Sequence, residues 1–364
     1  MWCLIVVTFN WLGGSRSWSW FYIGVTLHGR NAGSNTSALV ERVRWALTAH
    51  GWRPGELPEP PPDAALEPVV GVDVGGTKIH AALVPPAGPP LIDATVATDP
   101  RGNREVVGQI AALVEKLTDQ TEHAEQPRRI GIGTPGAPDP VTGTVAHAPN
   151  IPGWDQLDVA AELESRLGAR PVLHNDVNLA AWGERFWNAE HSGGDLAFVA
   201  VGTGIGLGLI LADQLHRGGH GLAGEIGDLP FGADPFEAEN LVHGPLETEV
   251  SGRGIERAYV RAGGSARLSV PEIFEAATAG DVIAERVIDD IGRLLAMTLR
   301  SVRAIVDPDT YVLGGGIGSR PETLAATLRW LEPVPGPDWR VHLSTLGPRA
   351  TVAGALAIAC SDMG

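Results

Sequence analysis

The stretch VVGVDVGGTKIHAALV, residues 69–84, decides the fold of this chain. Two apolar runs typical of strands, Val69–Val74 and Lys78–Val84, are joined by a turn that contains two glycines. A Rossmann dinucleotide-binding unit would follow its glycines with a helix, whereas an apolar strand follows them here. The stretch therefore predicts a β-hairpin whose turn binds phosphate.

The turn itself carries residues suited to a nucleotide. Gly75 and Gly76 allow a tight turn that brings backbone N–H groups to a phosphate oxygen. Thr77 adds a hydroxyl donor and Lys78 adds positive charge. Asp73, at the end of the first strand, can hold Mg²⁺ directly or through water. The alternative is an ordinary glycine hairpin turn.

A second turn of the same design lies in GTGIGLG, residues 202–208. Gly202, Thr203 and Gly204 follow the apolar run Leu196–Val201 and precede another apolar run. Two such turns predict two duplicated lobes that close on one nucleotide.

The motif HNDVN, residues 174–178, stands where a strand is expected to give way to a helix. The Asp176 carboxylate can accept the proton of a sugar hydroxyl as that hydroxyl attacks a γ-phosphate. Asn175 can hydrogen-bond a neighbouring hydroxyl. The alternative is that Asp176 or Asn178 only caps the helix.

Two further motifs have a functional and a plain interpretation. GLAGEIGD (residues 221–228) and Leu246-Glu247 contain carboxylates that either accept hydrogen bonds from sugar hydroxyls or are simply solvated. Gly314, Gly315 and Gly316 follow an apolar strand, so they either pack against a flat adenine ring or form a flexible turn.

Strand-like and helical patterns alternate along the rest of the chain, which predicts α/β layers. The expected strands are Val69–Val74, Lys78–Val84, Arg129–Gly133, Val172–Asn175, Leu196–Val201 and Tyr311–Leu313. The expected helices are Arg104–Leu117, Leu157–Leu167, Leu179–Trp187, Pro271–Ala279 and Val282–Ile305.

Composition narrows the class of protein. The 364 residues are 44% hydrophobic and carry a net charge of −16, which suits a globular protein whose bulk surface repels nucleic acid. Residues 1–55 differ, with five Arg against one acid, Glu41, or +4, so any contact with operator DNA would come from the N-terminus. Two cysteines, Cys3 and Cys360, exclude a disulfide framework and a thiolate zinc site and favour a reducing cytoplasm.

The N-terminus is irregular. Residues 1–27 hold four Trp and one charged residue, Arg16, and lack the basic start and the cleavage site of a signal peptide, so we expect an abnormal start and not export or a membrane span. Residues 35–52 predict a helix capped by Asn35 or Ser37 and ended by Gly51, with Arg42 and Arg44 off its apolar face. This helix, before a Pro-rich linker at 54–68, is either the last piece of a helix-turn-helix or a plain amphipathic helix.

Taken in order, these motifs resemble the ROK family of bacterial sugar kinases and sugar-responsive repressors, from about Val69 to Ala359. GIGTPGAPD (residues 131–139) and APNIPGW (residues 148–154) are also typical of that family. The resemblance implies a two-lobed ribonuclease-H/actin-like, hexokinase-type ATPase fold, preceded here by a short helical remnant. The implied lobes are residues 69–185 joined by a C-terminal helix at 349–364, and residues 186–348.

The resemblance also assigns roles to residues. It implies Asp176 as the catalytic base and a sugar site that consists of Gly136, Asn150, Asn175, Asp176, Glu225, Asp228 and Glu247. It implies a site for ATP and phosphate that consists of Asp73, Gly75, Gly76, Thr77, Lys78, Gly202, Thr203, Gly204, Gly314, Gly315 and Gly316, with Mg²⁺ at Asp73.

One departure from the family shapes the functional hypothesis. ROK kinases usually read EIGH followed by a cysteine-rich zinc motif, but Asp228 stands at the histidine position and no such cysteines follow. EIGDLPFG and GPLETEVSG instead resemble the zinc-less, repressor-like branch. We therefore expect a homo-oligomeric, cytoplasmic transcriptional regulator that binds a hexose or an N-acetylated amino sugar. The alternatives are an ATP-dependent, glucokinase-like sugar kinase and a binding protein with neither activity.

Overall fold

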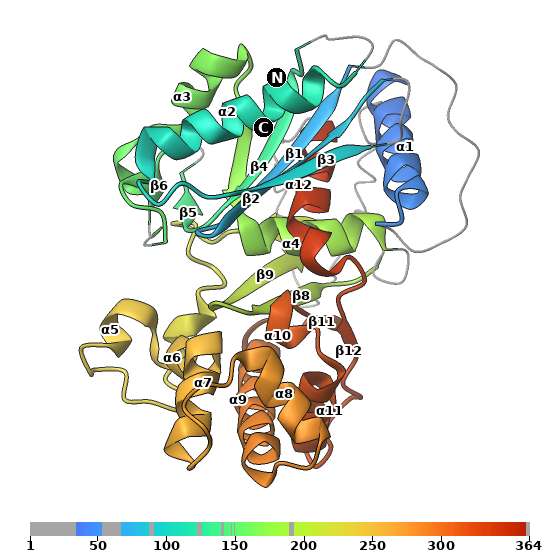
Figure 1. Cartoon of the computed structure of the whole chain (residues 1–364). Coiled ribbons are helices and arrows are strands. Elements are labelled where there is room, and N and C mark those ends of the chain that lie inside the picture. The colour runs from blue at the N-terminus through green and yellow to red at the C-terminus, as the bar shows by residue number, and fades with distance from the viewer. Residues whose placement is uncertain are drawn as a thin grey trace, which may run out of the picture.

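The computed structural model describes residues 34–52, 67–86, 91–121, 126–139, 142–146, 148, 150–188 and 193–361 (Figure 1). The expected abnormal start and most of the expected Pro-rich linker lie outside these residues. Within the described ranges, no helix is long and apolar enough to cross a membrane.

The predicted hairpin is the centre of the first sheet. β1 is antiparallel to β2, and the register places Asp73 opposite His80 and Val74 opposite Ile79. β1 and β4 run parallel, as do β4 and β7, so the sheet order is β3-β2-β1-β4-β7. The strands are β1 (Val69–Val74), β2 (Lys78–Val84), β3 (Ile92–Ala97), β4 (Arg129–Thr134) and β7 (Val172–Asn175).

The second sheet repeats this plan. Its order is β10-β9-β8-β11-β12, with β8, β9 and β10 antiparallel in turn and β8, β11 and β12 parallel. The strands are β8 (Leu196–Val201), β9 (Ile205–Leu211), β10 (Gln214–His216), β11 (Thr310–Gly314) and β12 (Val341–Leu343). The repeated order and direction confirm the predicted two-lobed α/β fold, and each glycine turn joins the first two strands of its sheet.

Helices cover both sheets (Figure 1). We call the first sheet with its helices the N-terminal lobe and the second the C-terminal lobe; the predicted boundaries between the lobes stay a prediction. The longer helices are α1 (Ser34–Ala49), α2 (Asn103–Thr118), α3 (Val159–Leu167), α4 (Asp176–Trp187), α7 (Gly252–Arg261), α8 (Val270–Thr278), α9 (Val282–Val306), α11 (Pro321–Leu331) and α12 (Ala350–Cys360). The short elements are β5 (Ala137–Pro138), β6 (Val145–Ala146), α5 (Asn240–His243), α6 (Pro245–Val250), α10 (Gly315–Gly318), and the 3-10 turns η1 (Trp154–Gln156), η3 (Ile226–Asp228) and η4 (Gly347–Arg349).

Most predicted elements begin and end within one or two residues of the observed ones, but α4 is an exception. It begins at Asp176, three residues before the predicted start at Leu179, because the Asn175 side chain accepts a hydrogen bond from the N–H of Asn178 and caps the helix. The cap is therefore Asn175, and neither Asp176 nor Asn178.

Two helices cross between the sheets, and each packs on the sheet of the other half of the chain. α4, which follows the first sheet in sequence, packs on β8 and β9, while α12, at the C-terminal end, packs on β1 and β4 (Figure 1). Their backbones touch at Gly183 and Gly354: a Cβ on Gly183 would lie 2.9 Å from the Gly354 nitrogen, and a Cβ on Gly354 would overlap the Leu179 carbonyl oxygen. Glycine is needed at both positions, because any side chain would force the helices apart.

A buried carboxylate ties α4 to the chain that leads into α12. Glu184 has no exposed surface. It accepts hydrogen bonds from the Ser344 and Thr345 hydroxyls, the latter at 3.0 Å, and from the N–H of Leu346 at 3.0 Å. A buried carboxylate that lost these donors would be left without hydrogen bonds away from water, which is costly. The three hydrogen bonds therefore hold α4 in position relative to the start of α12.

The N-terminal helix α1 corrects two expectations. Asn35 and Ser37 lie inside the helix, which begins at Ser34, so neither of them caps it. Arg42 is buried, not off the apolar face, and its Nε donates to the carbonyl of Pro85 at 3.2 Å. The apolar side of α1 packs into the core that contains α12, because this is where Leu39, Val43 and Leu47 find apolar partners.

Replacing Gly354 by Ala should destabilise the protein by about 3 kcal/mol, because the new methyl group collides with the backbone of α4. Thermal and urea unfolding of the purified variant measure this loss. Gly193→Ala is the matched control, since nothing lies within 4 Å of its added Cβ, and its stability should stay within about 0.5 kcal/mol. Equal stability of the two variants would contradict the close packing of the helices.

Candidate active site

The first glycine turn presents free donors. The hairpin is closed by the Gly75 N–H, which donates to the Lys78 carbonyl at 2.9 Å. Thr98, just after β3, braces the turn: its hydroxyl donates to the Gly75 carbonyl at 2.6 Å, and its N–H donates to the Thr77 carbonyl at 3.0 Å. Within the described residues the N–H groups of Gly76 and Thr77 have no hydrogen-bond partner, so both are available to an anion.

The second turn is also closed by its first glycine, but over a shorter span than the first turn. The Gly202 N–H donates to the Gly204 carbonyl at 2.8 Å, and Thr203 is exposed at the tip. The N–H groups of Thr203 and Gly204 make no hydrogen bond to any residue that the structure describes. Unlike the first turn, this one is held from the side by a carboxylate, because the Ile205 N–H donates to Glu247 at 3.1 Å.

Asn175 ends β7 and Asp176 begins α4, and the next residue, Val177, packs against Gly206 just past the second turn. The Asn175 amide nitrogen donates to the Gly136 carbonyl at 3.0 Å, which joins two residues of the predicted sugar site. An Asp176 carboxyl oxygen accepts from the N–H of Val177 at 2.8 Å. The carboxyl group is therefore oriented by the first turn of α4.

Two carboxyl groups of the candidate site interact and have raised pKa values. Burial, and then the charge of Asp176, raise the pKa of Asp73 to about 7, although Lys78 acts in the opposite direction. Burial raises the pKa of Asp176 to about 6, and the nearby Glu225 carboxylate adds to this rise. The site therefore concentrates negative charge away from water and favours a cation or a hydrogen-bond donor.

The remaining predicted sugar residues differ in their burial and in what they contact. Asn150 packs on the first turn, where a Cβ on Gly76 would lie 2.9 Å from the Asn150 Cβ. Glu225 is exposed at the start of η3, next to Asp176, and Asp228 is exposed at the end of η3. Glu247, in α6, is half-buried, and burial raises its pKa.

The three glycines after β11 are not equivalent. Gly314 is buried and faces the Phe198 ring, which a Cβ would overlap, so packing inside the lobe already requires this glycine. Gly315 has a φ of 77° and lies against the Val201 carbonyl. Gly316 is exposed, and its nitrogen would lie 3.7 Å from a Cβ on Gly202, so it borders the second turn. Of the three, Gly316 is the most accessible to a ligand.

Sequence reasoning missed two supporting residues. His174 is buried beside Asn175, and burial, followed by the charge of Arg217, lowers its pKa to about 4. Thr134 accepts a hydrogen bond from the Trp154 ring nitrogen at 2.8 Å, which ties the Thr134–Gly136 segment to η1. Only the strand-end position of both residues could have indicated them, because their partners are distant in sequence.

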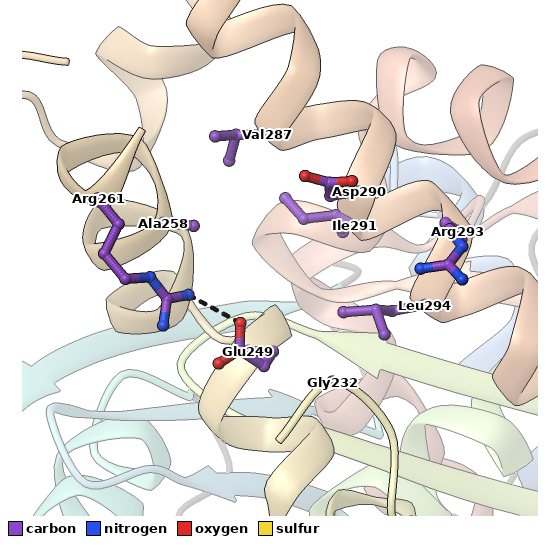
Figure 2. Close-up of a pocket in the computed structure, with 9 residues that line it drawn as sticks. All are labelled: Gly232, Glu249, Ala258, Arg261, Val287, Asp290, Ile291, Arg293 and Leu294. Carbon is purple, nitrogen blue, oxygen red and sulfur yellow. Dashed lines mark hydrogen bonds and ion pairs between the residues drawn. The ribbon is translucent and has the colours of Figure 1, made fainter. Parts of the chain in front are cut away.

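A separate cavity of about 190 Å³ lies between α7 and α9 (Figure 2). Its charged lining includes Glu249, which accepts a hydrogen bond from Arg261 at 2.9 Å, and also Asp290 and Arg293. No predicted sugar or phosphate residue lines it. This cavity is therefore distinct from the candidate site.

The duplicated sheets, with a glycine turn in the first hairpin of each and interacting carboxylates at the strand ends, define the class of two-lobed, actin-like hexokinase-type folds. A model of the ROK family matches residues 69–361. The chain belongs to the ROK family.

Named relatives agree with this assignment. The chain is 30% identical to a glucokinase from Streptomyces coelicolor over 80% of this chain and 96% of that protein. It is 31% identical to an N-acetyl-D-glucosamine kinase from Pasteurella multocida over 68% and 84%. The solved glucokinase from Streptomyces griseus, in complex with glucose and AMPPNP, is 28% identical with a TM-score of 0.66, over 80% of this chain and 98% of that one.

These relatives show that the expectation of a transcriptional regulator is wrong. The kinases above match at higher identity than a putative xylose repressor from Caldicellulosiruptor, which is 27% identical. The repressor interpretation rested on the zinc-less loop, on the LPFG stretch at residues 229–232 and on the basic helix before the linker. The structure packs that helix, α1, into the core with Arg42 buried, so the Arg42 side chain is not presented on the surface.

Replacing Asp176 by Asn should stabilise the ligand-free protein at pH 8. A carboxyl group whose pKa is raised by folding binds its proton more tightly in the folded protein than in the unfolded chain. Below about pH 4 the Asp176 carboxyl group is protonated in both states and costs the folded protein nothing. As pH rises from about 4 through about 6 the carboxyl group must ionise in the folded state, and the free energy of unfolding falls. Asn removes that loss, a gain of roughly 2 kcal/mol at pH 8 that disappears at pH 4.

Thermal unfolding at the two pH values measures this difference. Asp338→Asn, an exposed position, is the control and should change stability little at either pH. A variant at Asp176 that is equally or less stable than wild type at pH 8 would show that this carboxyl group is not held at an energetic cost.

Proposed function

We propose that this chain is an ATP-dependent sugar kinase that transfers the γ-phosphoryl group to a hydroxyl of a hexose or of an N-acetylated amino sugar. The observation that carries the proposal is the placement of Asp176. Its carboxyl group is half-buried at the carboxyl end of β7 and interacts with Asp73 and Glu225, and Asp73 leads directly into the first of two glycine turns with free N–H groups. The names of the relatives support the same reaction class.

The two turns supply the phosphate site. The free N–H groups of Gly76, Thr77, Thr203 and Gly204 would donate to phosphate oxygens, and Lys78 would add positive charge. Gly316 borders the second turn and would lie beside the adenosine.

Asp73 fits a divalent cation. Its carboxyl group is half-buried and is repelled by the charge of Asp176, so a hard cation with a preference for oxygen would relieve the repulsion. When bound, Mg²⁺ neutralises charge on the phosphate oxygens. The residues present therefore suit the metal that this reaction class requires.

Asp176 would act as the general base. With a pKa of about 6 it is largely ionised at pH 7, yet basic enough to take a proton as a hydroxyl begins its attack. The proton passes to an Asp176 carboxyl oxygen, the hydroxyl oxygen bonds to the γ-phosphorus, and the bond from that phosphorus to the ADP oxygen breaks.

The sugar would lie among Gly136, Asn150, Asn175, Glu225, Asp228 and Glu247. The carboxylates can accept hydrogen bonds from hydroxyl groups, and the amides can both donate to them and accept from them. This set of side chains therefore favours a polyhydroxylated ligand. Asp228 stands where ROK kinases have histidine, and we propose that its carboxylate accepts a hydrogen bond from a sugar hydroxyl. The homo-oligomeric state and the cytoplasmic location stay predictions.

The direct test is ADP release with Mg²⁺–ATP across a panel of hexoses and N-acetylated amino sugars. Wild type should release ADP with at least one sugar, and Asp176→Asn should lower kcat by about 10³-fold, because the base is lost. Sugar should still raise the thermal stability of that variant. Asp338→Asn should keep wild-type turnover, and full turnover by Asp176→Asn would remove Asp176 from the mechanism.

The pH profile gives a second test. Because the base works only when deprotonated, kcat/KM should fall about tenfold for each pH unit below about pH 6 and level off above it. Initial rates in buffers from pH 5 to pH 8 measure the profile. A flat profile down to pH 5 would contradict a base with a raised pKa.

A further inference from the structure

The short helix α6 is attached both to the predicted sugar site and to the second phosphate turn. At its start, Gly244 adopts a φ of 77° and lies so close to Gly227 in η3 that a Cβ would overlap the Gly227 carbonyl. Just past its end, the Gly252 N–H donates to the Gly202 carbonyl at 2.9 Å. A shift of η3 would therefore move α6, and α6 would in turn move the second glycine turn at Gly202.

Glu247, in the middle of α6, makes the direct connection. Its Oε2 accepts the Ile205 N–H at 3.1 Å, and its carboxyl carbon would lie 3.1 Å from a Cβ on Gly204. On its other side, the Glu247 Cβ would lie 3.4 Å from a Cβ on Gly227. One side chain thus contacts the turn proposed to hold phosphate through its carboxylate and the loop proposed to hold sugar through its Cβ.

This position has an electrostatic consequence. The Glu247 carboxylate lies against the turn whose N–H groups would receive phosphate oxygens. It also occupies the Ile205 N–H, which is the next donor after Thr203 and Gly204. Two anions in a partly desolvated site repel each other, so nucleotide binding is weakened while Glu247 stays there.

We propose that Glu247 couples sugar binding to nucleotide binding, an inference that rests on the proposed function. Hydroxyl groups of a bound sugar donate to the Glu247 carboxylate and draw it away from the second turn. The Ile205 N–H is released and the negative charge next to the phosphate site is compensated. Nucleotide binds tightly only after sugar, which limits the hydrolysis of ATP by water.

A purely structural role for Glu247 predicts a different result. If the carboxylate only braced the turn, its neutralisation would weaken nucleotide binding to the same degree with and without sugar. Under the proposal, neutralisation tightens nucleotide binding in the sugar-free protein and leaves little for sugar to add.

The test compares Glu247→Gln with wild type in the full chain. Glutamine keeps an acceptor for the Ile205 N–H but carries no charge, so the turn should stay folded. The dissociation constant of Mg²⁺–AMPPNP is measured by calorimetry without sugar and with the sugar that most raises thermal stability. Sugar should tighten nucleotide binding about tenfold in wild type and less than about twofold in the variant, whose sugar-free affinity exceeds that of wild type.

Glu249→Gln is the matched control. Glu249 lies in the same helix but faces away from the site, where it pairs with Arg261 at the cavity between α7 and α9 (Figure 2). This variant should keep the wild-type coupling between sugar and nucleotide.

Two results would overturn the proposal: wild type without coupling, or Glu247→Gln with coupling equal to that of wild type. Equal weakening of nucleotide binding with and without sugar would assign Glu247 a bracing role and also overturn it. ADP release by wild type is measured separately. An active kinase that fails the coupling test keeps its proposed function, whereas absent turnover with intact coupling would reject the kinase and retain the coupling.

Discussion

The crossing of α4 and α12 is the constraint on which the rest of the structure depends. The two helices approach so closely at Gly183 and Gly354 that their backbones are in contact, and each packs on the sheet of the other half of the chain. Glu184, in α4, then accepts three hydrogen bonds from the segment before α12, and these bonds limit sliding of one helix along the other. Because Asp176 is the first residue of α4, the same packing that joins the lobes also determines where the proposed base stands.

The candidate site concentrates carboxylates at the expense of stability. Asp73 and Asp176 are both held where burial and mutual repulsion disfavour their charged forms. A fold selected for stability alone would place amides or apolar groups there, so this arrangement indicates a function that needs charge. A base with a pKa near 6 and a carboxylate suited to a divalent cation are what phosphoryl transfer to a hydroxyl requires.

The interpretation of the N-terminal region shows how a local pattern can mislead. A basic helix before a proline-rich segment looks like the end of a DNA-binding module when only the sequence is considered. In the structure, α1 packs into the core beside α12, and the Arg349 guanidinium donates to the Gly51 carbonyl at 3.2 Å just past its end. Arg42 is buried and its Nε donates to the Pro85 carbonyl, so the helix packs as part of the described core.

By itself, the sequence was enough to predict the two glycine hairpins and the alternation of strands and helices, because turn chemistry and apolar periodicity are local properties. It was also enough to name the candidate site residues, because they stand in short motifs. It did not show that Asn175 caps α4, that Thr98 braces the first turn, or that Gly314 is required by Phe198, since each of these depends on a partner brought near by folding. The raised pKa of Asp73 and the contact of Glu247 with the second turn likewise arise only in the tertiary structure. Burial and the distance between charges decide both, and neither can be read from spacing along the chain.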